Sequence, residues 1–218
     1  MTEVLTALSR IGLVPVITID SPQDAVPLAA ALLAGGIGCA EITFRTSSAA
    51  HAIDGIRASC PDLLVGAGTV LTVPQAQHAA HAGAQFIVTP GFEPSVVDWC
   101  LEQDLPVIPG VATPTEVSMA LTRGLGLLKF FPAEAMGGVP MLEALHAPFA
   151  RTRFVPTGGI TAANLARYLA LPNVAACGGS WMAQRGMIAA GRFQEITRLS
   201  QQARAIVGQV RGESGGKP

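Results

Sequence analysis

One lysine in this sequence could form a covalent bond with a carbonyl compound. Lys129 lies in the apolar run LLKFFP, and the only other lysine, Lys217, lies near the C-terminus. Burial disfavours the charged form of an amine, and an unprotonated lysine attacks a carbonyl carbon to form a Schiff base. A lysine in a strand can instead extend its ammonium group to solvent or pair with a buried carboxylate. The run therefore offers a nucleophile, with a purely structural role as the alternative.

A carboxylate and a guanidinium group occur together in the run CAEITFRT (39–46). Alternation along a strand places Glu41 and Arg45 on one face, with Arg45 nearer the strand's C-terminal end. A carboxylate beside an amine can carry protons in each step of imine chemistry, and a guanidinium group binds a substrate carboxylate through two hydrogen bonds. The alternative is that these residues only pair with one another or with Lys129.

Two glycine pairs suggest a phosphate site that uses backbone N–H groups. They occur in PTGGIT and CGGSW, each after a strand-like run and before a helix start. Backbone N–H groups in such turns bind anions without help from a lysine or arginine side chain. The candidate phosphate ligands are the backbone groups of Gly158, Gly159, Gly179 and Ser180.

The elements that must position these residues alternate between short β-rich runs and Ala/Leu-rich, helix-like runs. The spacing of the β-rich runs, roughly 20 to 25 residues, is typical of a β-loop-α-loop unit. Eight such runs predict a (β/α)₈ TIM barrel whose chemistry lies at the C-terminal strand ends, where Thr69 also lies. The predicted strands are residues 14–19, 39–44, 63–68, 86–90, 106–111, 127–132, 153–158 and 174–179.

We expect an extra helix before the first strand (2–10) and a long helix near the end of the chain (about 193–210). Ser21, Thr113 and Thr161 are the expected N-caps of three intervening helices. The alternative architecture, an open doubly wound sheet, is disfavoured by the eight strands and by the lack of a G-x-G-x-x-G motif after the first one. Residues 1–218 are therefore expected to form a single domain with a polar tail at about 211–218.

Composition excludes several classes of partner. The formal net charge of −1 and the absence of basic runs argue against nucleic acids and anionic membranes. His78 and His81 lie one helical turn apart without a third ligand type, so no metal is expected. The four cysteines form no C-x-x-C pair, and Glu3 and Ser9 interrupt any signal-peptide core, which predicts a cytoplasmic protein.

The motifs, taken in order, resemble one known family over nearly the whole chain. The sequence is similar to the class I 2-keto-3-deoxy-6-phosphogluconate (KDPG) aldolases of the Entner–Doudoroff pathway, many of which also cleave 4-hydroxy-2-oxoglutarate (KHG). The resemblance implies a (β/α)₈ barrel, a homotrimer, a phosphorylated 2-keto acid as substrate, and no metal or other cofactor. The motifs that carry it are EITFRT, GAGTVL, IPGVATPTE, KFFPAE, PTGGI and GGSW.

The resemblance also implies roles for individual residues. Lys129 would form the Schiff base and Glu41 would act as the general acid and base. Arg45, Thr69, Pro90 and Phe131 would bind the pyruvate end of the substrate. Thr157 and Ser180 would contact the substrate tail, with Gly158, Gly159 and Gly179 around the phosphate. Relatives specific for the galactonate isomer depart from the threonine in PTGG, so Thr157 favours the gluconate substrate.

Other functions stay open at this point. A phosphate-binding barrel such as an epimerase or a decarboxylase would use paired carboxylates or a metal and would not need Lys129. A 2-keto-3-deoxy-6-phosphogalactonate aldolase and a non-catalytic barrel that binds phosphorylated ligands are further alternatives.

Overall fold

Parallel strands form the centre of the molecule. The computed structural model describes residues 2–212, and each predicted β-rich run contains a strand. The fifth run is divided in two at Pro109, which has no N–H group to donate, although its carbonyl oxygen still accepts a hydrogen bond from the backbone of Lys129 (2.9 Å). The strands are β1 (Leu13–Ile17), β2 (Cys39–Thr43), β3 (Leu64–Gly68), β4 (Ile87–Val88), β5 (Val107–Ile108), β6 (Gly110–Val111), β7 (Leu127–Phe130), β8 (Arg153–Pro156) and β9 (Cys177–Gly179).

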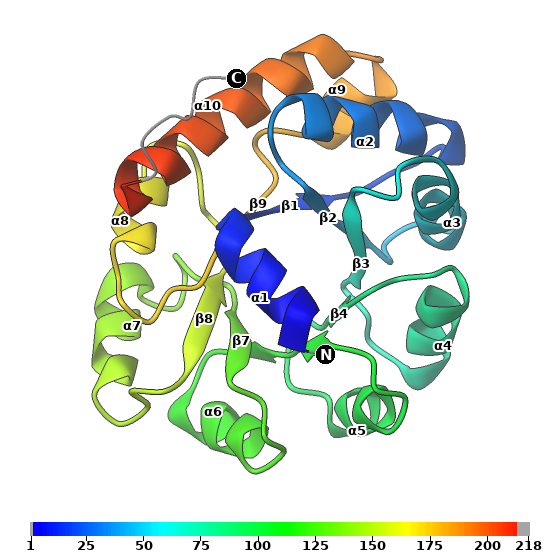
Figure 1. Ribbon diagram of the computed structural model, residues 1–218. Coiled ribbons are helices and arrows are strands. Elements are labelled where there is room, and N and C mark those ends of the chain that lie inside the picture. The colour runs from blue at the N-terminus through cyan, green and yellow to red at the C-terminus, as the bar shows by residue number, and fades with distance from the viewer. Residues whose placement is uncertain (1, 213–218) are drawn as a thin grey trace.

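The strands close into a barrel. Strands pair in the order β5-β4-β3-β2-β1-β9 and β6-β7-β8. Parallel bridges from Phe154 to Val174 and from Thr157 to Gly178 join the two groups at β8 and β9, and the chain itself joins them at Pro109. The closed order, with a helix after almost every strand, confirms the predicted (β/α)₈ barrel and excludes the open sheet (Figure 1).

The helices form a ring around this barrel, as Figure 1 shows. The long helix α10 packs against α2 and α8, and it begins and ends within one residue of the predicted range. The predicted tail lies outside the described residues, except that Arg211 ends α10 and Gly212 caps it. The helices are α2 (Ala25–Ala34, after the 3₁₀ turn Pro22–Asp24), α3 (Ala49–Ser59), α4 (Val73–His81), α5 (Pro94–Glu102), α6 (Pro114–Leu121), α7 (Gly138–His146), α8 (Leu165–Leu169), α9 (Arg185–Ala189) and α10 (Phe193–Arg211).

One of the three expected N-caps forms a full capping interaction. Thr113 accepts a hydrogen bond from the backbone of Glu116, whose carboxylate accepts one from the backbone of Thr113, so α6 begins with a capping box. Ser21 precedes the 3₁₀ turn without a side-chain cap. The prediction for Thr161 is wrong: α8 begins at Leu165, because Asn164 accepts the backbone N–H of Thr161 and holds the intervening residues in a turn.

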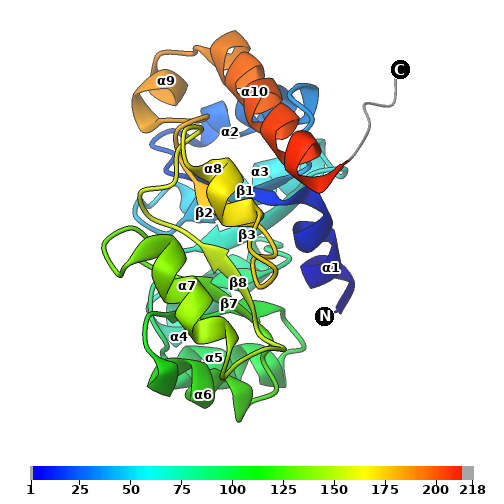
Figure 2. The same ribbon diagram turned by 90° about the vertical axis from the view of Figure 1, so that its left-hand side faces the viewer.

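The helix α1 (Thr2–Ile11) covers the N-terminal end of the barrel, as predicted for an extra first helix. Its residues lie beside the first residues of β5, β7 and β8 (Figures 1 and 2). Arg211 fastens its end by donating hydrogen bonds to the carbonyl oxygens of Ser9 (2.6 Å) and Arg10 (2.8 Å). With this end of the barrel closed, the opposite end remains for a ligand.

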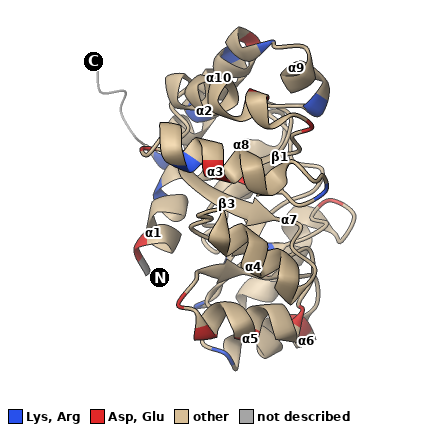
Figure 3. Cartoon of the chain, turned by 90° about the vertical axis from the view of Figure 1, so that its right-hand side faces the viewer, with Lys and Arg blue, Asp and Glu red and all other residues tan. Residues whose placement is uncertain are grey.

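Charged residues are scattered over the outer helices and loops on the side that Figure 3 shows. No helix among residues 2–212 combines the length and the apolar character needed to span a bilayer.

Candidate functional site

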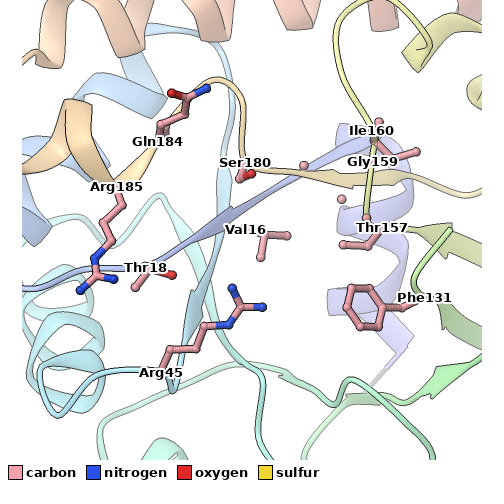
Figure 4. A pocket seen from close by; sticks show the side chains of 14 residues that line it. Val16, Thr18, Arg45, Phe131, Thr157, Gly159, Ile160, Ser180, Gln184 and Arg185 are labelled. Carbon is pink, nitrogen blue, oxygen red and sulfur yellow. The ribbon is translucent and has the colours of Figure 1, made fainter. Parts of the chain in front are cut away.

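A cavity of about 420 Å³ opens at the C-terminal ends of β1, β8 and β9. Its wall combines apolar side chains, hydroxyl groups, glycine backbone and two arginines (Figure 4). It is the place in the barrel where chemistry is expected. Seven of the predicted site residues line it: Arg45, Phe131, Thr157, Gly158, Gly159, Gly179 and Ser180.

Lys129 and Glu41 form a buried ion pair within the barrel. The Nζ atom of Lys129 lies 3.3 Å from Oε1 of Glu41, and the two side chains are 5% and 3% exposed. Phe131, two residues after Lys129, lines the cavity, and its ring centroid is 5.2 Å from Nζ. The pairing that the sequence left open as an alternative is therefore present, and it also brings a nucleophile and a proton carrier together beside the cavity.

Gly68 makes room for the Glu41 carboxylate, and Gly110 makes room for the backbone of Pro90. A Cβ atom on Gly68 would lie 2.0 Å from Oε1 of Glu41, and one on Gly110, the β6 partner of Lys129, would lie 2.2 Å from the carbonyl oxygen of Pro90. A side chain at Gly110 would collide with backbone, and one at Gly68 would force the Glu41 carboxylate to move. Gly68, the second glycine of GAGT, therefore leaves the space that the Glu41 carboxylate occupies.

The glycine pairs after β8 and within β9 bring backbone to the cavity wall. Gly158 and Gly159 have φ values of 97° and 81°, which side chains with a Cβ atom rarely adopt. A Cβ atom on Gly179 would lie 1.9 Å from Cζ3 of Trp181, so the indole packs directly on the strand. Positive-φ backbone beside a cavity can turn N–H groups toward an anion.

Glu134 and Tyr168 support the loop that contains Gly158 and Gly159. The Tyr168 hydroxyl donates a hydrogen bond to Glu134, and burial together with this carboxylate raises the pKa of Tyr168. The Glu134 backbone donates to the carbonyl oxygen of Gly158 (3.1 Å), and a Cβ atom on Gly159 would lie 2.5 Å from Cγ of Glu134. The last residue of KFFPAE thus holds the PTGG turn in place.

Besides the buried Lys129 and Glu41, two more predicted site residues, Thr69 and Pro90, do not line this cavity. Thr69 follows β3 and has a φ of 55°, an unfavourable value for a residue with a branched side chain. Such strain is found mostly where function constrains the backbone. Pro90 follows β4 and contacts the backbone of β6 through Gly110.

Sequence reasoning missed several residues of the cavity wall, among them Val16, Thr18, Gln184 and Arg185. Val16 is the strand partner of Glu41, so the predicted barrel pairing could have found it. Arg185 had no signal in the sequence. It lies at the start of α9 and forms two hydrogen bonds with Asp20, a residue far away in the sequence (Nε–Oδ2 2.7 Å, Nη2–Oδ1 2.6 Å).

Cysteine and metal chemistry are not supported by the described residues. Cys39, Cys60, Cys100 and Cys177 are free. Burial raises the pKa of Cys39, of Cys177 and of Cys100, the last to about 12, so these thiols stay protonated. No group of three or more His, Cys, Asp or Glu residues between positions 2 and 212 could hold a metal ion.

Comparisons with known proteins agree on one family. The family model described as KDPG and KHG aldolase matches residues 4–199. A 2-dehydro-3-deoxy-phosphogluconate aldolase from Treponema pallidum is 56% identical over 208 residues, which cover 95% of this chain and 99% of the relative.

Two solved structures are similar in fold and sequence. A KDPG aldolase from Legionella pneumophila, with pyruvate captured at low pH as a covalent carbinolamine intermediate, has a TM-score of 0.87 and 42% identity, covering 91% of this chain and 96% of that one. A KDPG aldolase from Zymomonas mobilis with 3-phosphoglycerate has a TM-score of 0.86 and 38% identity, covering 93% and 95%.

Proposed function

This chain belongs to the KDPG and KHG aldolase family and is a carbon–carbon lyase, and we propose that Lys129 forms a Schiff base with its substrate, KDPG. The products are pyruvate and glyceraldehyde 3-phosphate. The observation that carries this proposal is the buried contact of 3.3 Å between Lys129 and Glu41 beside the cavity. The covalent pyruvate adduct in the similar Legionella structure supports the same chemistry.

The contact between the two side chains suits proton transfer before and during catalysis. Transfer of a proton from Lys129 to Glu41 leaves a neutral amine, which attacks the C2 carbonyl carbon of the substrate. Glu41 then protonates the departing C2 hydroxyl group, water leaves, and a cationic imine forms. Glu41 is thereby left as a carboxylate, the state that the next step needs.

The imine draws electrons from the bond that breaks. Glu41 removes the proton of the C4 hydroxyl group, the C3–C4 bond breaks, and its electron pair moves to form an enamine while C4 becomes the aldehyde carbon of glyceraldehyde 3-phosphate. Glu41 returns its proton to C3, and hydrolysis of the imine frees pyruvate and Lys129. One carboxylate serves all steps because each leaves it in the protonation state required next.

The remaining site residues divide between the two ends of the substrate. We assign the pyruvate carboxylate to Arg45, with Thr69, Pro90 and Phe131 around the pyruvate group. Thr157, Ser180 and the backbone of Gly158, Gly159 and Gly179 take the phosphorylated tail. The support is that Arg45 lies just after β2, the strand that holds Glu41, whereas the last group lies on β8, β9 and their loops.

Borohydride trapping tests the imine directly. Incubation with pyruvate and borohydride should add one pyruvate-derived group to the chain and abolish activity, and peptide mapping should locate the group on Lys129. Lys217, which lies outside the described residues, is the internal control because it is the only other lysine. Label on Lys217, or no label, contradicts the proposal.

Substrate choice is tested by pyruvate release from three compounds. KDPG should be cleaved well, KHG should also be cleaved, and the galactonate isomer should be cleaved poorly because Thr157 is present. We further propose that the enzyme is a single-domain, cytoplasmic homotrimer without a metal. A sedimentation experiment reports the subunit number, and a chelator should leave the cleavage rate unchanged.

A further inference from the structure

Arg185 is a charged residue of the cavity wall that has no role in the mechanism above. Among the described residues that line the cavity, those with a charged side chain are Arg45 and Arg185, and both are cationic. Arg45 follows β2, the strand of Glu41, whereas Arg185 follows β9 and Ser180. The two positive charges thus come from the chain after β2 and after β9, the two strands that pair with β1.

The guanidinium group of Arg185 is held at the rim of the cavity. Its Nε and Nη2 atoms donate to Asp20, which does not line the cavity, and the two side chains are 63% and 43% exposed. Figure 4 shows this group beside Thr18, while the guanidinium group of Arg45 points toward the middle of the cavity. Within residues 2–212, Nη1 of Arg185 has no hydrogen-bond partner. Because a guanidinium group has five N–H donors, donors remain for a ligand.

We propose that Arg185 binds the phosphate group of the substrate and thereby sets the preference for phosphorylated over unphosphorylated substrates. This inference rests on the proposed function. KDPG carries an anionic group at each end, and the cavity wall offers one arginine for each. The planar guanidinium group matches a phosphate group through paired hydrogen bonds. Asp20 neutralises Arg185 while the cavity is empty. When the substrate binds, the guanidinium group donates hydrogen bonds to the phosphate.

The alternative is that Arg185 only fastens α9 to the loop after β1 through Asp20. The two possibilities differ in what removal of Asp20 does. If Arg185 binds phosphate, Asp20→Asn frees the guanidinium group and does not weaken the binding of KDPG. If Arg185 only holds α9 in place, Asp20→Asn and Arg185→Gln break the same contact and change the KM for KDPG equally.

Steady-state kinetics on KDPG and KHG test the proposal. Arg185→Gln should raise the KM for KDPG about fivefold, the size expected for an ion pair that solvent partly screens, with kcat close to the wild-type value. Arg185→Lys should recover part of this loss. The KM for KHG should change much less, because that substrate ends in a carboxylate one carbon beyond C4 and carries no phosphate. Added salt should raise the KM of the wild-type enzyme for KDPG more than that of Arg185→Gln.

The matched control is a second arginine–aspartate pair. Arg123 donates to Asp98 through the same two atoms, Nε (2.5 Å) and Nη2 (3.2 Å), but neither residue lines the cavity. Arg123→Gln should therefore leave both KM values at the wild-type level.

Three results overturn the inference. They are an unchanged KM for KDPG in Arg185→Gln, equal increases for KDPG and KHG, and an increase in Asp20→Asn as large as that in Arg185→Gln. Failure of the proposed function is distinguishable, since in that case the wild-type enzyme does not release pyruvate from KDPG or form the borohydride adduct.

Discussion

Two acid–base ion pairs lie in opposite surroundings, one buried beside the cavity and one at the cavity's rim. Lys129 and Glu41 are nearly fully buried within the barrel, whereas the side chains of Arg185 and Asp20 are 63% and 43% exposed at its mouth. The buried pair has one partner for each charge, and glycines such as Gly68 fix its position. Solvent screens the exposed pair. A single change in the buried pair should therefore abolish a chemical step, whereas one in the exposed pair should only change an affinity.

The largest effect is expected for Lys129→Met. Without an amine no imine forms, so cleavage of both KDPG and KHG should disappear. The change also leaves the Glu41 carboxylate buried without its partner, which should lower the free energy of unfolding by about 3–5 kcal/mol near neutral pH.

Urea denaturation measures this loss, and the double variant Lys129→Met/Glu41→Gln is the control. The double variant should regain most of the stability because no unpaired charge remains. If the single variant is as stable as the wild-type protein, the pair contributes no electrostatic free energy and the contrast with the rim disappears.

Gly68→Ala should come next, because it moves the proton carrier without removing it. The new methyl group would lie 2.0 Å from Oε1 of Glu41, so the carboxylate must shift. A displacement of about 1 Å at a reacting group can lower kcat on the order of 10²-fold. Both substrates should be affected equally, as measured by pyruvate release. Gly186→Ala is the control, because no described atom lies within 4 Å of a Cβ atom there.

Loss of a tail hydroxyl should have a smaller and substrate-dependent effect. Ser180→Ala and Thr157→Ala should each lower kcat/KM for KDPG by about 10- to 100-fold, the value of one hydrogen bond to a charged group, and lower it less for KHG. Equal losses on the two substrates would place these residues at the pyruvate end.

The smallest effect concerns the titration of Asp20. The hydrogen bond and charge of Arg185 hold the pKa of Asp20 below its ordinary value of 3.8. Because the folded-state pKa is lowered, the stabilisation is fully present above about pH 3.8 and is lost as the pH falls through the folded value. NMR titration of the Asp20 carboxyl group should show its pKa rising toward 3.8 in Arg185→Gln, and no rise would mean that the pair is not formed in solution.

The same contrast explains what the sequence could predict. Glu41 and Lys129 were recognisable because charged residues in apolar strands conflict with burial, and strand alternation predicted the face on which Glu41 lies. The glycine pairs were recognisable because they end the last two predicted strands, and the C-terminal ends of all strands lie at the same end of a barrel. Each of these inferences needs only local pattern and one rule of the fold.

Other features depend on contacts between distant parts of the chain. Arg185 joins the cavity because the loop after β9 meets Asp20, and the sequence does not indicate that meeting. Asn164, and not Thr161, precedes α8. Both residue types are common N-caps, so the sequence alone does not distinguish between them. Pro109 divides a strand that looked continuous. Proline has no N–H group, and whether this gap interrupts a strand depends on the hydrogen bonds that the neighbouring strands offer there.

Exchange of the pyruvate methyl protons with deuterated water, followed by NMR, tests most directly whether Lys129 and Glu41 share the chemistry as described. Exchange requires both an imine and a base that converts it to the enamine. The wild-type enzyme should exchange the protons, and Lys129→Met should not. Glu41→Gln should exchange them about 10²–10⁴-fold more slowly at every pH, the usual contribution of a positioned base, while still yielding the borohydride adduct after long incubation. Full recovery of exchange in Glu41→Gln at high pH would contradict the account, because it would mean that Glu41 only influences the charge of Lys129.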